Sequence, residues 1–239
     1  MKFPNKEKME QFAQMIKLRE PLADDVIGFM DGLSLTTECM DDRLTQNTYY
    51  CGYDCDAMVN NVLAFWADGK EFFCALYYPG SWADGSVTAQ LFPHMKSRIG
   101  KYKICVDQGF LHSGDVDAGV LVCPVARRTA QHSHCDVCDN MLWLSNVYTS
   151  LWQASEWGMQ GLQGTIPQCK KWLQSDCIER RLVLENIIYV HNFWTHIVGH
   201  NQIQTVFDPE YENVINIQGY NRIERYYYCP GDYETDDDD

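Results

Sequence analysis

The chain has 239 residues, of which 46% are hydrophobic and 13% aromatic, so it is long and apolar enough for one sizeable α/β domain. Its net charge of −14 argues against strong autonomous DNA binding, because Lys and Arg supply most non-specific affinity for phosphates. No apolar run reaches the roughly 18–20 residues of a membrane helix, and the N-terminus has no apolar signal-peptide core. We therefore expect a nuclear or cytoplasmic protein that has no membrane partner and is not secreted.

Residues 6–19 place apolar side chains at helical spacing and predict an amphipathic helix that Pro21 ends. The apolar run 26–30 predicts a short buried strand with Asp31 at its C-terminal end. Residues 33–56 are polar and irregular in pattern, and no regular element is expected there.

A β-hairpin is expected next, because residues 58–66 and 71–78 are apolar runs separated by an Asp-Gly dipeptide. A helix is then expected over residues 86–98, and Asp84 or Ser86 would serve as its N-cap.

Two more strands and two helices are expected in the second half. Residues 103–106 form a buried apolar run closed by Asp107, and residues 119–125 form another. Helices are predicted over residues 140–163 and, most clearly, 176–199. For the last helix we expect one broad buried face made of Leu182, Leu184, Ile187, Ile188, Val190 and Ile197. The order of elements favours an α/β fold in which helices cover a mixed sheet.

Eleven cysteines would indicate a disulfide framework in a secreted protein. Here no export signal is seen and the number is odd, so reduced thiols are expected. Cys135-x-x-Cys138 has the local spacing of zinc ligands, and Cys51-x3-Cys55 would supply a second pair. A single CxxC is a weak signal, so a structural zinc site is only an alternative.

Three acids occupy the ends of predicted strands. Asp31 and Asp107 directly follow buried runs, and Asp84 follows the hairpin after a turn. Binding sites in α/β sheets gather at the carboxyl ends of strands, and Asp31 and Asp107 would lie side by side if their two strands are neighbours. Such carboxylates repel each other unless a cation such as Mg²⁺ neutralises them. Each Asp alone is also an ordinary turn residue, so spacing alone does not establish a site.

Five segments together resemble the conserved blocks of Harbinger-type DDE transposases, and the whole chain is similar to an expanded group of such proteins in oomycetes. The resemblance implies an RNase H-like fold, which is a mixed β-sheet flanked by helices. We divide the chain into an N-terminal helix (1–25), the RNase H-like catalytic domain (26–206) and a C-terminal extension with a disordered acidic tail (207–239). The segments are VIGFMDG (26–32), YYPGSWADGS (77–86), ICVDQGF (104–110), QASEWGMQGLQG (153–164) and LENIIYVHNF (184–193).

The family cleaves DNA with divalent metal, so the resemblance implies a Mg²⁺- or Mn²⁺-dependent endonuclease or transposase. The family's first catalytic Asp falls on Asp31, and the Asp after its later strand falls on Asp107. Asp84 matches an acid that we assign to the metal site as an accessory ligand. Glu156 is the candidate for the catalytic Glu on the following helix. In the general reaction two bound metals would activate water or a 3′-hydroxyl for in-line attack at phosphorus.

Departures from the family pattern bear on activity. The first block usually reads Asp-Gly-Thr-His, whereas Leu-Ser follows Gly32 here. The family's Glu usually stands four residues before the glycine that matches Gly158, and that position is Ala154. Glu156 lies two residues later, about 200° around a helix. We would also expect Arg in related copies at Cys135, Cys138, Trp152, Trp172 and Trp194. A mutated copy follows as a hypothesis, with a catalytically inactive DNA- or protein-binding module as the alternative function.

DNA is the expected partner, and basic side chains could form a track for it beside the acids. Solvated surface pairs are the alternative. The 25 residues before the first predicted strand are too few for a helix-turn-helix domain, so we expect a separate DNA-binding partner protein. An oligomer is compatible with the sequence. The candidate DNA-binding residues are Lys96, Arg98, Lys101, Lys103, Arg127, Arg128, Lys170 and Lys171.

Overall fold

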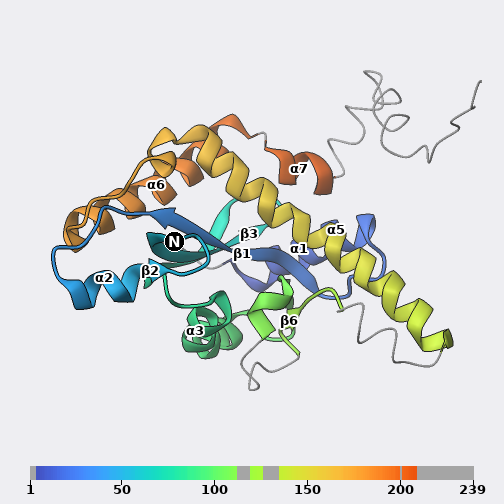
Figure 1. Ribbon diagram of the computed structural model, residues 1–239. Helices are drawn as coiled ribbons and strands as arrows, with labels where there is room; N and C mark the ends of the chain where they lie inside the picture. The colour runs from blue at the N-terminus through green and yellow to red at the C-terminus, as the bar shows by residue number, and fades with distance from the viewer. Residues whose placement is uncertain (1–3, 112–118, 126–134, 200, 209–239) are drawn as a thin grey trace, which may run out of the picture.

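The apolar runs of the sequence pair into one mixed sheet, which helices flank (Figure 1). The computed structural model describes residues 4–111, 119–125, 135–199 and 201–208. The predicted α/β class, a mixed sheet covered by helices, is therefore confirmed. Of the helices in these ranges, none is both long and apolar enough to cross a bilayer.

The sheet has β1 at its centre. On one side β1 pairs antiparallel with β3, which also pairs antiparallel with β4 and with the short β2. On the other side β1 pairs in parallel with β5, and β5 pairs in parallel with β6. The described strands are β1 (Val26–Thr36), β2 (Tyr50–Cys51), β3 (Asp56–Trp66), β4 (Glu71–Pro79), β5 (Lys103–Cys105) and β6 (Leu121–Val122).

Helices pack on both faces of this sheet. α5 crosses β1, β3 and β5, whereas α3 packs against β3 and β4, and α6 covers β4 (Figure 1). The described helices are α1 (Lys6–Arg19), α2 (Arg43–Tyr49), α3 (Asp84–Ile99), α5 (Cys135–Thr165), α6 (Cys177–Val198) and α7 (Gln202–Phe207), with 3₁₀ turns η1 (Gln108–Leu111) and η2 (Pro167–Lys170).

Side chains of successive residues along β1 point alternately towards α3 on one face of the sheet and towards α5 on the other. Gly32 faces the start of α3, because a Cβ added to it would stand 2.5 Å from Oδ1 of Asp84. Phe29 pairs with Phe65 of β3, whose ring packs against Gly158 of α5. Since successive residues of a strand point to opposite faces, odd-numbered positions of β1 face α5.

Several elements agree closely with the sequence. α1 spans the predicted residues 6–19. The hairpin turn places Gly69 at φ 78°, a conformation that favours glycine. Asp176 caps the start of α6 by accepting hydrogen bonds from two backbone N–H groups, and Gly199 ends it at φ 60°.

The prediction that β1 ends at Asp31 is wrong. The strand continues to Thr36, which pairs with Met58 of β3. Leu33 and Leu35 alternate into the core and keep the strand buried beyond the acid, so it extends past the polar dipeptide. The segment after it, expected to be irregular, contains α2 and β2.

The structure also corrects the expected N-cap of α3. Within the described residues the N-cap is Ala83, and it makes no side-chain capping bond. Asp84 instead lies in the first turn, where its carboxylate packs over Gly32. Neither Asp84 nor Ser86 therefore caps this helix.

The expected buried face of α6 is partly wrong. Leu182, Val190 and Ile197 are 55%, 54% and 63% exposed. Apolar residues lie on two opposite sides of this helix, so their spacing does not show which side faces the sheet. The residues that it buries are Arg180, Leu184, Ile187, Ile188, His191 and Thr195.

Candidate carboxylate site

Asp31 and Asp107 lie on neighbouring parallel segments. The register of β1 and β5 pairs Phe29 with Cys105, and two residues further along each chain are Asp31 and Asp107. Because side chains alternate, both acids share a face with that pair. The charge of Asp107 accordingly raises the pKa of Asp31. The two acids are brought together as the sequence predicted for neighbouring strands.

Asp84 joins them from the start of α3. Its carboxylate lies so close to Gly32 that any Cβ at that position would meet both of its oxygens within 2.6 Å. Burial is the main cause that raises the pKa of Asp84, and the charge of Asp107 adds to it. The charge of Asp84 in turn raises the pKa of Asp31. Gly32 thus gives the carboxylate of Asp84 room on the α3 face of β1, whereas the side chain of Asp31 points to the α5 face.

Glu156 approaches from α5, which is an unbroken helix around it. Ala154, where the resemblance would place a catalytic Glu, is fully buried, whereas Glu156 is half-buried on a different side of the helix. Its charge raises the pKa of Asp31, but it is the last of the contributing causes. The structure therefore brings Glu156 within electrostatic range of Asp31, as the outermost acid of the group.

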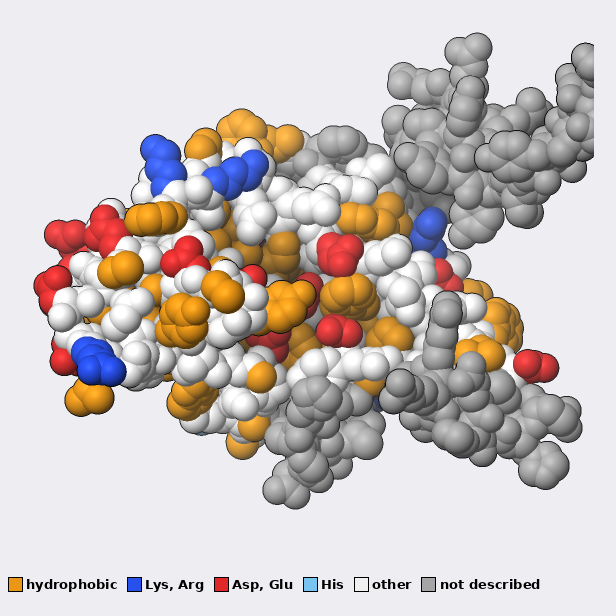
Figure 2. Space-filling view, in the orientation of Figure 1, with side chains coloured by type: hydrophobic (Ala, Val, Ile, Leu, Met, Phe, Trp, Pro, Cys, Tyr) orange, Lys and Arg blue, Asp and Glu red, His pale blue; other side chains and the backbone are white. Residues whose placement is uncertain are grey.

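The electrostatic environment of Asp31 is unfavourable for its charge. Burial is the largest cause, and with the three other acids it raises the pKa of Asp31 to about 7. The backbone N–H of Gly32 donates a hydrogen bond of 2.8 Å to Oδ1, which acts in the opposite direction. Figure 2 shows acidic side chains in the middle of this face, with Lys and Arg towards its margins. The pKa of Asp31 therefore lies near neutral pH, where its carboxylate binds a proton.

The donor set suits a hard divalent cation. All four side chains offer carboxylate oxygens, the ligands that Mg²⁺ and Mn²⁺ prefer. Across the described ranges, however, no three His, Cys, Asp or Glu side chains already stand in a metal-holding arrangement. Asp31, Asp84, Asp107 and Glu156 thus fit such an ion by their chemistry, and they would have to draw closer around it.

Cys123 is a neighbour that the sequence did not single out. It directly follows β6, and the charge of Asp107 raises its thiol pKa, after the larger effect of burial. The signal that could have found it is the parallel pairing of β5 with β6, which brings the residues after both strands together.

Four of the predicted DNA-binding residues lie away from the acids. Lys96 and Arg98 stand in the last turn of α3, a 16-residue helix whose first turn holds Asp84, so about 20 Å of helix separates them. Lys101 precedes β5 and Lys103 begins it, so both lie at the opposite end of the strand from Asp107. These four residues therefore do not form a track beside the carboxylates.

Lys170 and Lys171 lie near the C-terminal end of β1, where Thr37 stands about 20 Å of strand beyond Asp31. They adjoin η2, and Leu173, just after them, bridges to Thr37 at the end of β1. Both lysines are exposed. Arg127 and Arg128 fall outside the described residues.

The zinc alternative gains no support from the arrangement of the chain. Cys51 and Cys55 belong to β2 and the turn after it, whereas the Cys135–Cys138 segment opens α5. Figure 1 places β2 and the start of α5 at opposite ends of the molecule. The two cysteine pairs are therefore separated across the fold.

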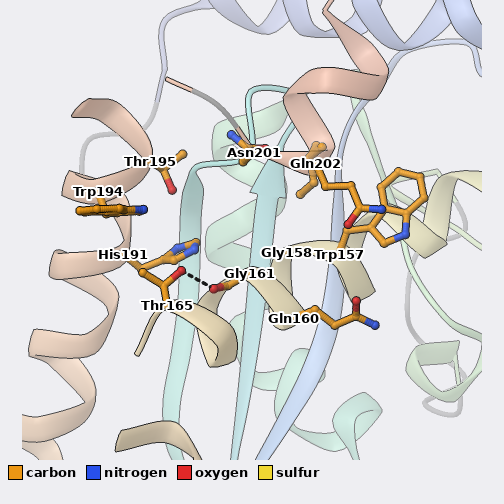
Figure 3. Close-up of a pocket in the computed structure, with 12 residues that line it drawn as sticks. Trp157, Gly158, Gln160, Gly161, Thr165, His191, Trp194, Thr195, Asn201 and Gln202 are labelled. Atoms are coloured by element: carbon orange, nitrogen blue, oxygen red, sulfur yellow. Dashed lines mark hydrogen bonds between the residues drawn. The ribbon is translucent and has the colours of Figure 1, made fainter. Parts of the chain in front are cut away.

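A second buried carboxylate lies at the start of β4. The carboxylate of Glu71 is 2.5 Å from Nδ1 of His191, and both side chains are buried. Asn192 adds two hydrogen bonds to the Glu71 backbone, of 2.9 and 3.1 Å. His191 also borders a cavity of about 330 Å³ between α5, α6 and the start of α7 (Figure 3). These contacts tie α6 to the hairpin, so His191 and Asn192 have a structural role.

Comparison with known proteins gives no match for this chain among protein-family models, curated proteins or solved structures. The site is therefore interpreted from its residues and their geometry.

Proposed function

We propose that this chain is the catalytic domain of a Harbinger-type DDE transposase, a Mg²⁺- or Mn²⁺-dependent endonuclease that cleaves phosphodiester bonds in DNA. The observation that carries the proposal is the convergence of four acids that are distant in sequence. Asp84, Asp107 and Glu156 all act on the pKa of Asp31, which rises to about 7. Titratable groups perturbed in this way concentrate at functional sites.

The order of the strands supports an RNase H-like fold. Three antiparallel strands, β4, β3 and β1, continue into two parallel strands, β5 and β6. α3 makes the crossover between β4 and β5. Asp31 lies on the central strand and Asp107 follows its parallel neighbour, so the two acids stand where the antiparallel and parallel halves of the sheet meet.

In this proposal Asp31 and Asp107 hold the metal, and Asp84 and Glu156 complete its surroundings. A bound divalent ion supplies Lewis-acid activation of water or a 3′-hydroxyl and stabilises the charge of the leaving oxygen. The chain's own contribution is to orient the oxygens. The N–H of Gly32 fixes Oδ1 of Asp31, and partial burial limits competition from water.

DNA would reach the site with little help from the surface charge of the chain. Among the predicted basic residues in the described ranges, Lys170 and Lys171 are exposed near the C-terminal end of β1. The net charge is −14, so site-specific binding is assigned to a separate DNA-binding protein, and the activity to the nucleus.

Calorimetric titration with Mn²⁺ and Mg²⁺ tests the metal site. We expect the wild type to bind, and Asp107→Asn to weaken binding by roughly 100-fold, because a half-buried carboxylate ligand is lost. Asp41→Asn, which removes an exposed carboxylate, is the matched control and should bind as the wild type does.

Nicking of a supercoiled plasmid by the same three proteins tests catalysis. Nicking that disappears in Asp107→Asn and persists in Asp41→Asn supports an endonuclease. Equal nicking by all three proteins would point to a contaminating nuclease and contradict the proposal.

One observation favours the alternative of an inactive DNA- or protein-binding module. The position of the family's Glu is Ala154, which is buried, and Glu156 contributes least to the charge around Asp31. A wild type that binds neither ion in the titration would establish this alternative.

A further inference from the structure

The helix α6 exposes an apolar surface on its outer side. Five large side chains fall within about 100° of its circumference, directly opposite the buried side chains that face the sheet. An outer helix face is normally polar, and a helix that is apolar all round is normally covered on all sides. We call these five residues the outer stripe: Ile178, Leu182, Tyr189, Phe193 and Ile197, which are 67%, 55%, 61%, 66% and 63% exposed.

The exposed area is that of an interface. Val190 flanks the outer stripe and is also 54% exposed. Large apolar side chains carry on the order of 150–250 Å² each, so these six together expose roughly 700 Å². The largest apolar patch of a typical monomer is about 300–600 Å², whereas each partner of a stable complex buries about 800 Å².

The outer stripe has the same spacing in both directions along the helix. In an antiparallel pair of α6 helices centred between Ile187 and Ile188, each residue meets a suitable side chain at its own level. Ile178 is level with Ile197 of the second copy, and Leu182 is level with Phe193 of the second copy. At the middle, Asn186 is level with Tyr189 of the second copy, so a polar pair marks the register. A surface that complements itself in this way suits a twofold dimer.

Charge also permits this contact. The ionisable side chain at the edge of the outer stripe near its middle is Glu185, and Arg181 pairs with it at 2.8 Å. The five residues of the outer stripe carry no charge, and Glu179, which lies within the same arc, is level with His196 of the second copy in the antiparallel pair.

We propose that the outer stripe of α6 packs against the outer stripe of a second copy of this chain and forms an antiparallel, twofold-symmetric dimer. This inference does not depend on the proposed nuclease function. Each copy carries a net charge of −14, so the copies repel one another at long range. Added salt screens that repulsion and strengthens the dimer.

Sedimentation equilibrium of the full chain measures the association. We expect a wild-type dimer whose dissociation constant falls when NaCl is raised from about 0.05 to about 0.5 M. The variant Leu182→Glu/Phe193→Glu should weaken association by roughly 100-fold or more, because carboxylates enter an apolar contact. Both side chains are exposed, so the fold is expected to persist, as circular dichroism would show.

The matched control is Leu44→Glu/Tyr53→Glu. It makes the same change in charge at two side chains that are 77% and 95% exposed and lie outside α6. It should dimerise like the wild type. A monomeric wild type, or equal weakening in both double variants, would overturn the proposal.

A photo-crosslink identifies what covers the outer stripe. Benzoylphenylalanine at position 189 should react with residues 182–193 of a second copy, which a mixture of isotope-labelled and unlabelled chains distinguishes from reaction within one chain. Crosslinks to residues 209–239 of the same chain would show that the C-terminal segment covers α6, and the dimer would be rejected.

Discussion

Glu71 and Asp31 are both largely buried carboxylates on the strands of one sheet, but their neighbours differ in charge. Glu71 faces a basic side chain, whereas Asp31 faces other acids. Glu71 lies 2.5 Å from a histidine nitrogen, and Asn192 holds its backbone. Asp31 has three other acids around it, and in the described part of the chain no Lys or Arg forms an ion pair with it. Glu71 therefore has an ion-pair partner within the protein, although its Oε2 accepts no hydrogen bond from the described residues. The arrangement around Asp31 is stable only with a proton or a cation.

This difference separates a structural carboxylate from a binding one. A buried acid with its own partner stabilises a contact, here between β4 and α6. Repelling acids lower stability, so their convergence calls for another explanation, and a metal ion supplies one. The following variants test this distinction, from the largest expected effect to the smallest.

Removal of one partner from the buried pair should have the largest effect. Glu71→Gln or His191→Ala is expected to lower the free energy of unfolding by about 3–5 kcal/mol, because the remaining polar group loses its partner without access to water. Urea denaturation measures this change. His196→Ala, an exposed histidine on the same helix, should change stability by less than about 0.5 kcal/mol. A loss below about 1 kcal/mol for both pair variants would contradict the structural role.

Removal of the Asp31 carboxylate is expected to raise the free energy of unfolding instead of lowering it. In the metal-free protein its pKa rises from 3.8 to about 7, so the folded state keeps a proton that the unfolded state releases. The wild type should therefore lose stability as the pH rises from about 4 to about 7, and then level off. Asp31→Asn escapes this loss and should be more stable than the wild type by on the order of 2 kcal/mol at pH 8, but not at pH 3.5.

Urea denaturation with EDTA at both pH values measures the difference. Asp41→Asn, at an exposed acid, should follow the wild type at each pH. If Asp31→Asn were destabilised at pH 8, Asp31 would be a structural group like Glu71.

Metal affinity should depend on the same proton. Below pH 7 the ion has to displace the proton of Asp31, so the association constant for Mn²⁺ should fall about tenfold for each pH unit and stay nearly constant above pH 7. Calorimetry between pH 5.5 and 8.5 measures this profile. An affinity that is constant across this range would place the ion elsewhere.

Glu156 should show the smallest effect. Because it is half-buried and contributes least to the pKa of Asp31, Glu156→Gln is expected to weaken Mn²⁺ binding by about 3–10-fold, less than Asp107→Asn. Glu7→Gln, at an exposed acid on α1, is the control. A loss for Glu156→Gln as large as that for Asp107→Asn would make Glu156 a principal ligand.

Sequence patterns predicted the elements whose ends have a local cause. α1 begins after Asn5, whose side chain caps it, and α6 lies between Asp176 and Gly199. The Asp-Gly turn likewise marks the hairpin. Pairing between strands has no such local mark. β1 continues past Asp31 because β3 pairs with it as far as Met58, which the sequence of β1 alone does not reveal.

The candidate site was predictable in its residues and not in its geometry. Strand ends pointed to Asp31 and Asp107, but the closeness of Asp84 depends on the missing side chain of Gly32. For the basic residues, closeness along the sequence did not predict closeness in the fold. Lys96 and Arg98 are close to Asp107 in the sequence. They lie at the C-terminal end of α3, whose first turn holds Asp84, so the length of the helix separates them from the acids.

The continuation of β1 through the site has a mechanical consequence. Asp31 sits within a strand that is hydrogen-bonded beyond it, so its backbone is a rigid anchor. Asp84 stands at a helix start, and Asp107 follows the end of a strand, so both can shift with less disruption. In the proposed metal site, Asp31 is therefore the fixed ligand, and Asp84 and Asp107 are the ligands that can move. Ions of different radius would be accommodated by movement of Asp84 and Asp107 towards an unmoving Asp31.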